Sequence, residues 1–174
     1  MLTEKRSEIK LIILDIDGVM TDGSKMYGTD GKVIAKKYND KDFTAIKRFR
    51  AAKIPVCFLS GDNRINKKMA KNRNIDFYYS RGKDKASFVK DFQSKYGASP
   101  QQMLYVGDDL FDLSILRTVG YSFCPNDAIS AVKETCGHRG VIPCEGGKNT
   151  IAALYDLLLD RRLIKEATIK NIEA

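Results

Sequence analysis

The chain has 174 residues, of which 43% are hydrophobic and 30% charged, an ordinary balance for a water-soluble globular protein. No apolar run approaches the roughly 20 residues of a membrane span, and the first residues lack the apolar core of a secretory signal, so we expect one cytoplasmic domain, residues 1–174. The net charge of +8 would suit a nucleic-acid binder, but the basic residues are dispersed and do not alternate with aromatic ones, which argues against specific nucleic-acid binding.

A buried strand followed by two carboxylates stands near the start of the chain. Residues 11–14 form an unbroken apolar run, which predicts a strand covered on both faces of a parallel sheet. Asp15 and Asp17 follow directly, where the carboxyl ends of strands bind ligands in open α/β sheets. Gly18 and Gly23 allow the sharp turns of such a loop. An isolated D-x-D pair could simply cap a turn, but polar groups also follow later strands and favour a functional site.

The next segment predicts a β-hairpin inserted at about residues 24–38. Gly28 and Gly31 bracket Thr29 and Asp30, as a hairpin turn requires. Such a hairpin would project from the carboxyl edge of the sheet. There it could cover the site, join a neighbouring subunit, or form an inert flap.

The rest of the chain alternates between short apolar strands and amphipathic helices. This alternation predicts an α/β fold with an open, mostly parallel sheet, because right-handed crossovers keep successive strand ends on one edge. Asp40 or Asp42 would cap the first helix, and Asp62 or Asn63 the second. We expect strands at residues 55–59, 75–79, 103–106 and 120–124, helices at about 64–73 and 126–135, and a helical tail at about 148–174.

Two later strand ends carry groups that could bind an anion. The strand at 55–59 runs into Ser60 and Gly61, which offer a hydroxyl and accessible backbone N–H groups. Lys85 lies in the first turn of an expected helix, where a cation opposes the helix dipole and costs a few tenths of a kcal/mol unless a negative ligand offsets it. Alone, each signal is weak, since Ser-Gly-Asp is often only a helix cap.

A dense acidic cluster follows the strand at 103–106. It consists of Asp108, Asp109 and Asp112, whereas one or two aspartates would suffice as helix caps. Carboxylates about 4 Å apart repel by on the order of 4 kcal/mol at an effective dielectric of 20, so a divalent cation is expected among them. All-oxygen ligands favour Mg²⁺. A carboxylate after the first strand could then accept a phosphoryl group while a second one moves the proton.

In order, these motifs resemble the four motifs of the haloacid dehalogenase superfamily of phosphatases, over nearly the whole chain. The matching stretches are D-I-D-G-V-M-T-D-G, L-S-G-D, the lysine of K-D-K, and G-D-D-L-F-D. The small size, the lack of a cap domain beyond the hairpin, and the run T-D-G…Y…D-G-K resemble the capless subfamily of 3-deoxy-D-manno-octulosonate 8-phosphate phosphatases. Sialic-acid-type phosphatases share that outline. The resemblance implies a Rossmann-like three-layer fold.

The same resemblance implies roles for individual side chains. Asp15 would be the nucleophile and a Mg²⁺ ligand, Asp17 the general acid/base that also offers its backbone carbonyl to the metal, and Asp108 a further ligand. The residues expected to bind substrate are Ser60, Gly61, Lys85 and Lys148, and those expected to orient the site from outside are Asp109 and Asp112.

The family is commonly tetrameric, with the hairpin and tail of one subunit closing the site of another, and it acts on small phosphorylated sugar acids for lipopolysaccharide synthesis. Three positions depart from its pattern. Ala152 replaces an arginine of the family tail, Asp62 replaces the arginine that commonly follows the second motif, and Asp42-Phe43 replaces Asp-Gly. The phosphatase chemistry survives these changes, and the substrate stays open.

Three other functions compete with this interpretation. A phosphatase of another sugar phosphate or of polynucleotide ends would suit the altered tail or the positive charge. A signalling receiver domain also uses an aspartate, acidic metal ligands and a lysine, but its phosphoacceptor follows a later strand than the D-x-D found here. A non-catalytic relative could serve as an oligomerisation module, although the carboxylates are all present.

Overall fold

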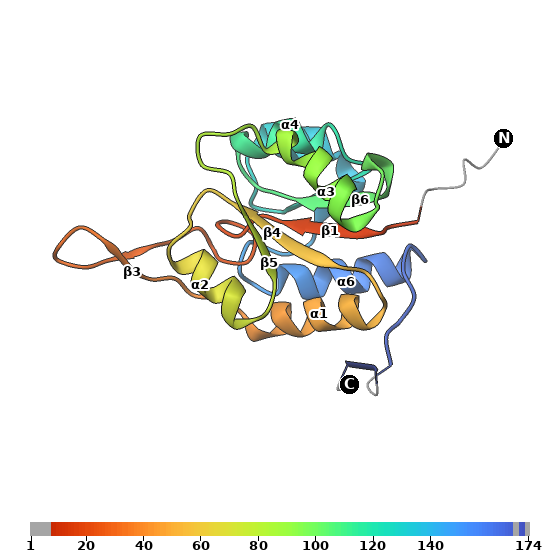
Figure 1. The fold of residues 1–174 in the computed structure, drawn as a ribbon, viewed down its shortest axis with the longest axis horizontal. Coiled ribbons are helices and arrows are strands. Elements are labelled where there is room, and N and C mark those ends of the chain that lie inside the picture. Colours follow the sequence, from red (N-terminus) through yellow and green to blue (C-terminus); the bar gives the residue numbers. More distant parts are fainter. Residues whose placement is uncertain (1–7, 169–170, 173–174) are drawn as a thin grey trace.

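The computed structural model describes residues 8–168 and 171–172, which form a three-layer α/β fold around one six-stranded sheet (Figure 1). All pairs within this sheet are parallel, and its strand order is β5-β4-β1-β6-β7-β8. The expected fold class is confirmed, and within the described ranges no cap domain separates the first two motifs. The strands are β1 (Leu11–Leu14), β4 (Val56–Ser60), β5 (Asp76–Tyr79), β6 (Met103–Val106), β7 (Tyr121–Pro125) and β8 (Val141–Ile142).

Helices cover both faces of the sheet (Figure 1). Along β1, Ile12 and Leu14 pack into the core on one face, and Leu11 and Ile13 into the core on the other, so every side chain of this central strand is buried. None of the helices in the described ranges is both long and apolar enough to cross a bilayer. The first face carries α1 (Asp40–Ala51), α2 (Ile65–Asn72) and α6 (Thr150–Asp160), and the second carries α3 (Val89–Tyr96), α4 (Leu113–Leu116) and α5 (Ser130–Cys136).

The boundaries expected from sequence are close to the observed ones. The strands at 11–14 and 103–106 coincide with β1 and β6, the strand at 75–79 differs from β5 by one residue at its start, and those at 55–59 and 120–124 are each displaced by one residue from β4 and β7. The helix expected at 126–135 begins later, at Ser130 of α5. The expected helical tail at 148–174 is interrupted, because α6 ends at Asp160 and residues 161–168 form no helix, whereas residues 171–172 are helical again. Residues 169–170 and 173–174 of that tail, and residues 1–7 at the other end, lie outside the described part.

The inserted hairpin projects beyond the body of the molecule, at the left of Figure 1. It pairs β2 (Met26–Tyr27) antiparallel with β3 (Val33–Ala35), and Gly31 in its turn has a φ of +73°. Both residues of β2 are 63% exposed, and Ile34 of β3 is 62% exposed. The hairpin therefore exposes several apolar side chains on an element that protrudes from the fold.

The buried carboxylate of Asp42 connects α1 to α6. Its Oδ1 accepts hydrogen bonds from the backbone N–H groups of Ile151 (2.8 Å) and Ala152 (3.1 Å), two of the unpaired donors at the start of α6. The expectation that Asp40 or Asp42 caps α1 is wrong, because Asn39 occupies that position and accepts from the backbone N–H of Lys41. Burial raises the pKa of Asp42 to about 6, although the two backbone hydrogen bonds oppose the shift.

Replacement of Asp42 by alanine is expected to lower the free energy of unfolding by about 2 kcal/mol, because the α6 donors lose their acceptor inside the protein. Asparagine keeps an acceptor oxygen and should cost less than about 1 kcal/mol. The folded pKa of Asp42, about 6, exceeds its ordinary value of 3.8, so the wild-type contribution to stability is complete below pH 3.8 and is lost as pH rises through 6.

Asp42→Asn should therefore flatten the dependence of stability on pH between about 4 and 6. Urea unfolding of both variants across this range would measure the effect, with Asp40→Ala as the exposed control in the same helical turn. Equal losses for the alanine and asparagine variants would show that the Asp42 carboxylate does not cap α6.

Candidate active site

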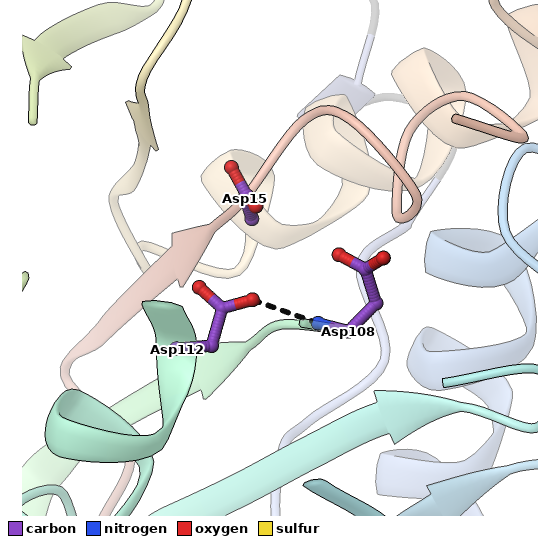
Figure 2. Close-up of side chains that lie close together, drawn as sticks. All are labelled: Asp15, Asp108 and Asp112. Carbon is purple, nitrogen blue, oxygen red and sulfur yellow. Dashed lines mark hydrogen bonds between the residues drawn. The ribbon is translucent and has the colours of Figure 1, made fainter. Parts of the chain in front are cut away.

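Three carboxylates gather at the carboxyl edge of the sheet, above its two central strands (Figure 2). One oxygen each of Asp15, Asp108 and Asp112 lies within 4.8 Å of the other two. Asp15 directly follows β1, and Asp108 follows β6 by two residues. Because β1 and β6 are parallel neighbours, their carboxyl ends meet, and the structure places Asp15 and Asp108 together at the edge where both were expected.

Lys85 bridges two of these carboxylates. Its Nζ lies 2.6 Å from Asp112 Oδ1 and 3.1 Å from Asp15 Oδ2, and its side chain is only 7% exposed. Tyr105, whose side chain is buried beneath the site, donates its hydroxyl to Asp112 Oδ1 (2.5 Å) and accepts from Lys85 Nζ (3.0 Å). Sequence reasoning missed Tyr105, because within the apolar run of β6 it is indistinguishable from a core aromatic residue.

Asp112 organises the loop after β6. Its Oδ2 accepts from the backbone N–H groups of Asp108 (2.9 Å; dashed in Figure 2) and Asp109 (3.1 Å). Asp109 is exposed, and its own carboxylate accepts from the N–H of Leu110 at the start of the short 3₁₀ turn Leu110–Asp112. Both side chains therefore shape the loop that presents Asp108.

Burial and mutual repulsion perturb the acidic groups. Desolvation raises the pKa of Asp15 to about 7, with Lys85 opposing the shift. Desolvation, together with the charges of Asp15 and Asp112, raises the pKa of Asp108 to about 8. Burial would lower the pKa of Lys85, but the charges of Asp15 and Asp112 outweigh it and keep the ammonium protonated. A cation near Asp15 and Asp108 would favour their charged forms.

The site fits a small hard cation. Asp108 Oδ1 is buried and accepts no hydrogen bond from any described residue. Gly18, with a φ of +83°, lies so close that a Cβ there would be 1.9 Å from Asp108 Oδ2, so the loop admits only glycine beside this carboxylate. Carboxylate oxygens such as those of Asp15 and Asp108 are the donors that Mg²⁺ prefers.

The carboxylate of Asp17 belongs to a second cluster of polar side chains. Lys36 Nζ lies 2.7 Å from Asp17 Oδ1 and 3.0 Å from Oδ2, and Asn66 Nδ2 donates to Oδ2 (3.1 Å). Asn66 Nδ2 also donates to Ser60 Oγ (3.0 Å), which links the ends of β1 and β4. Lys36 and Asn66 carry no sequence signal, because one is among many lysines and the other lies in a basic helix.

Ser60, the last residue of β4, is buried, whereas Gly61 after it is exposed. Ser60 is 1% exposed, and its Oγ accepts from the backbone N–H of Asp62 (3.3 Å) as well as from Asn66. Asp62 does not form the N-cap of α2, which is Arg64, but its Oδ1 accepts from the Arg64 N–H (3.0 Å). Gly61 is exposed, and a Cβ there would meet nothing within 4 Å, which leaves its backbone open to a ligand.

Lys148 is the expected site residue that the structure does not bring to the carboxylates. Its side chain is 66% exposed and its Nζ pairs with Glu145 Oε2 at 2.5 Å. The two glycines before it instead contact the loop after β1. A Cβ on Gly146 would lie 2.1 Å from the carbonyl oxygen of Gly18, and the N–H of Gly147 donates to the carbonyl of Val19 (2.9 Å).

Comparisons with known proteins agree with this geometry. The sequence pattern of haloacid dehalogenase-like hydrolases matches residues 62–147. The chain is 32% identical over 159 residues to the 3-deoxy-D-manno-octulosonate 8-phosphate phosphatase of Haemophilus influenzae, covering 91% of this chain and 87% of that one. It is 29% identical over 156 residues to the Escherichia coli phosphatase of the same name, covering 89% of this chain and 81% of the other.

The solved cobalt-bound structure of the deoxy-D-mannose-octulosonate 8-phosphate phosphatase of Haemophilus influenzae has the same fold. It superposes with a TM-score of 0.80 at 32% identity and covers 88% of each chain. The likeness thus extends from the sheet to nearly the full length of both proteins. The chain is a phosphatase and belongs to the haloacid dehalogenase-like hydrolases, in the family of the 3-deoxy-D-manno-octulosonate 8-phosphate phosphatases.

Proposed function

We propose that this phosphatase hydrolyses a small phosphorylated sugar acid, 3-deoxy-D-manno-octulosonate 8-phosphate or a sialic-acid-type 9-phosphate, with Mg²⁺ as its cofactor. The observation that carries the proposal is the convergence of Asp15, Asp108 and Lys85 at the end of β1, in a chain whose relatives act on that octulosonate. A role in lipopolysaccharide precursor synthesis follows from the substrate. The cobalt-bound relative supports a divalent metal at the carboxylates.

The chemistry proceeds in two phosphoryl transfers. A carboxylate oxygen of Asp15 attacks phosphorus, the bond from phosphorus to the sugar oxygen breaks, and Asp17 gives its proton to that leaving oxygen. Water then attacks the aspartyl phosphate, Asp17 takes a proton from it, and Asp15 is released with inorganic phosphate. Both steps balance without an oxidant, a reductant or a second substrate.

Other side chains hold the phosphoryl group and its charge. The Lys85 ammonium, next to Asp15 Oδ2, would neutralise a phosphoryl oxygen, and Ser60 with the open backbone at Gly61 would donate hydrogen bonds. Mg²⁺, held by Asp15, Asp108 and the Asp17 carbonyl, would supply electrostatic stabilisation of the phosphoryl oxygens. Lys148 would contribute to sugar binding only after leaving Glu145.

We further propose that the protein is a cytoplasmic homotetramer, and the hairpin supports the assembly. Two exposed residues of β2 and Ile34 of β3 offer an apolar surface on a protruding element, which a neighbouring subunit could bury. The hairpin would then close the site of that neighbour. We also propose that residues 1–174 form a single domain in each subunit. Light scattering of the purified protein would measure the number of subunits in the assembly.

Phosphate release from a panel of substrates would test the function. The panel contains the two sugar acid phosphates, other sugar phosphates, a 3′-phosphorylated oligonucleotide and p-nitrophenyl phosphate, each with Mg²⁺ and with EDTA. We expect selective turnover of a sugar acid phosphate and a loss of at least about 100-fold on chelation.

The other outcomes would contradict the proposal in different ways. Preference for the oligonucleotide, with binding that falls steeply with salt, would indicate a polynucleotide-end phosphatase. Failure to hydrolyse even p-nitrophenyl phosphate would favour a non-catalytic oligomerisation module. Full activity in EDTA would exclude the metal.

A further inference from the structure

Lys36 lies outside the expected motifs, yet its ammonium is buried at the site. It directly follows β3, so the returning strand of the hairpin carries it back to the end of β1. Its side chain has 0% exposure, and Nζ contacts Asp17, Asp62 Oδ2 (2.7 Å) and Asn66 Oδ1 (3.0 Å). Burying an ammonium is costly unless it is paired, so a fully buried lysine here requires these partners.

The geometry of Asn66 fixes the orientation of this cluster. Its amide oxygen accepts from Lys36 and from the Tyr38 hydroxyl (2.8 Å), and its amide nitrogen donates to Asp17 and Ser60. Rotating the amide by a half turn would place its nitrogen against the Lys36 ammonium and its oxygen against the Asp17 carboxylate, so these two contacts fix its orientation. Asn66 is 0% exposed and lies in α2, so a packed helix supports one side of the cluster.

We propose that Lys36 is a positioning residue that holds the Asp17 carboxylate in place for proton transfer, and that Asp62 and Asn66 in turn hold Lys36. This inference rests on the proposed function, in which Asp17 is the general acid/base. It extends the site to the hairpin and to Asp62, whose Oδ2 contacts Lys36.

The contacts of Lys36 distinguish this role from phosphate binding. An ammonium has three N–H donors, and Lys36 faces oxygens of three side chains, Asp17, Asp62 and Asn66. No donor remains for a phosphoryl oxygen while these contacts persist. Lys36 therefore acts on the reaction through its partners, and of these only Asp17 has a proposed chemical role.

The two oxygens of Asp17 are held unequally. Oδ2 accepts from both Lys36 and Asn66, whereas Oδ1 accepts from Lys36 alone among the described residues. Oδ1 therefore keeps more lone-pair capacity and is the oxygen assigned to carry the transferred proton. Misplacing it by about 1 Å can cost about 100-fold in rate.

If Lys36 positions Asp17, the effect of a Lys36 variant on kcat/KM should depend on the leaving group of the substrate. A general disturbance of the site should instead affect all substrates equally. When Asp15 bonds to phosphorus and the sugar oxygen departs, that oxygen needs the proton from Asp17, because an alkoxide is a poor leaving group. The oxygen of p-nitrophenol departs as a stable anion and needs no proton. The parameter kcat/KM reports the steps up to and including this bond cleavage, so it isolates the proton donation.

The test compares Lys36→Met with wild type on p-nitrophenyl phosphate and on whichever sugar phosphate of the panel wild type hydrolyses fastest. We expect kcat/KM to fall about 100-fold for the sugar phosphate and less than about fivefold for the aryl phosphate. Lys37→Met, at the exposed neighbouring position, is the matched control and should leave both values unchanged. Wild-type inactivity on every substrate would refute the proposed function itself, whereas equal losses on both substrates, or none, would overturn only the positioning role.

Two further variants keep the test decisive. Combined with Asp17→Asn, Lys36→Met should lower sugar phosphate turnover no further than Asp17→Asn alone, because both changes impair the same proton transfer. A larger loss in the double variant would show that Lys36 acts independently. If circular dichroism shows that Lys36→Met does not fold, Asp62→Asn replaces it. We expect this variant to lower the ratio of kcat/KM for the sugar phosphate to kcat/KM for the aryl phosphate by several-fold. An unchanged ratio would overturn the proposal.

Discussion

Asp15→Asn is expected to lower kcat by at least about 10⁴-fold on every phosphate ester, because a carboxamide does not form the aspartyl phosphate. The amide has nearly the shape of the carboxyl group, so it should occupy the same space at the end of β1. The loss should therefore be equal for sugar and aryl phosphates, unlike the loss expected at Lys36. Steady-state phosphate release at high enzyme concentration, with substrate still in excess, would measure it.

The fold should tolerate this change. Burial raises the pKa of Asp15 to about 7, so at pH 8 the wild-type protein bears the cost of a buried carboxylate that the neutral amide avoids. Asp91→Asn, on the exposed side of α3, is the matched control and should keep full activity. Normal turnover by Asp15→Asn would exclude Asp15 as the nucleophile.

Lys85→Met is expected to cost both activity and stability. The loss of a cation beside the phosphoryl group should lower kcat/KM by about 10³-fold. The loss of the ion pairs to Asp15 and Asp112 should lower the free energy of unfolding by about 3–5 kcal/mol at pH 8, because two buried carboxylates lose their counter-charge. Phosphatase assays and urea unfolding would measure the two effects separately.

The change of this stability loss with pH tests whether Lys85 stabilises the fold through its charge. Without Lys85 the pKa of Asp15 should rise further above its ordinary value of 3.8, so the folded state holds the proton more tightly than the unfolded state. The stability loss should therefore be smaller at pH 5 than at pH 8. Lys90→Met, at an exposed position, should change neither property. A loss that is the same at both pH values would mean that Lys85 stabilises by packing rather than by charge.

Sequence patterns predict the sheet and its carboxyl edge because the relevant signals are local. The apolar run before Asp15 and the one before Asp108 each define a buried strand, and the acidic residues that follow necessarily lie at strand ends. Parallel pairing then brings them together without further information. The placement of Asp15 and Asp108 at one edge therefore needed only the parallel sheet, whereas Lys85 reaches Asp15 from the 3₁₀ turn Lys85–Phe88, which follows the edge strand β5.

The supporting residues could not be predicted, because their contacts are to distant parts of the chain. Lys36, Asn66 and Tyr105 act through partners from other elements, and nothing in their flanking sequence distinguishes them from a surface lysine, a helix amide and a core aromatic. Asp42 is a similar case. Its local sequence favours a cap for α1, but packing of α1 on α6 turns its carboxylate to the other helix.

The contacts of Gly146 and Gly147 also constrain when the loop after β1 can reach its final structure during synthesis. The loop after β1 is made early in synthesis, yet its carbonyl at Val19 is held by Gly147, and β1 itself pairs with β6. Contacts between segments so far apart in sequence form only after both have emerged from the ribosome. A nascent chain that ends before residue 146 would therefore contain Asp15, Asp17 and Asp108 but lack the hydrogen bond that ties the loop after β1 to Gly147.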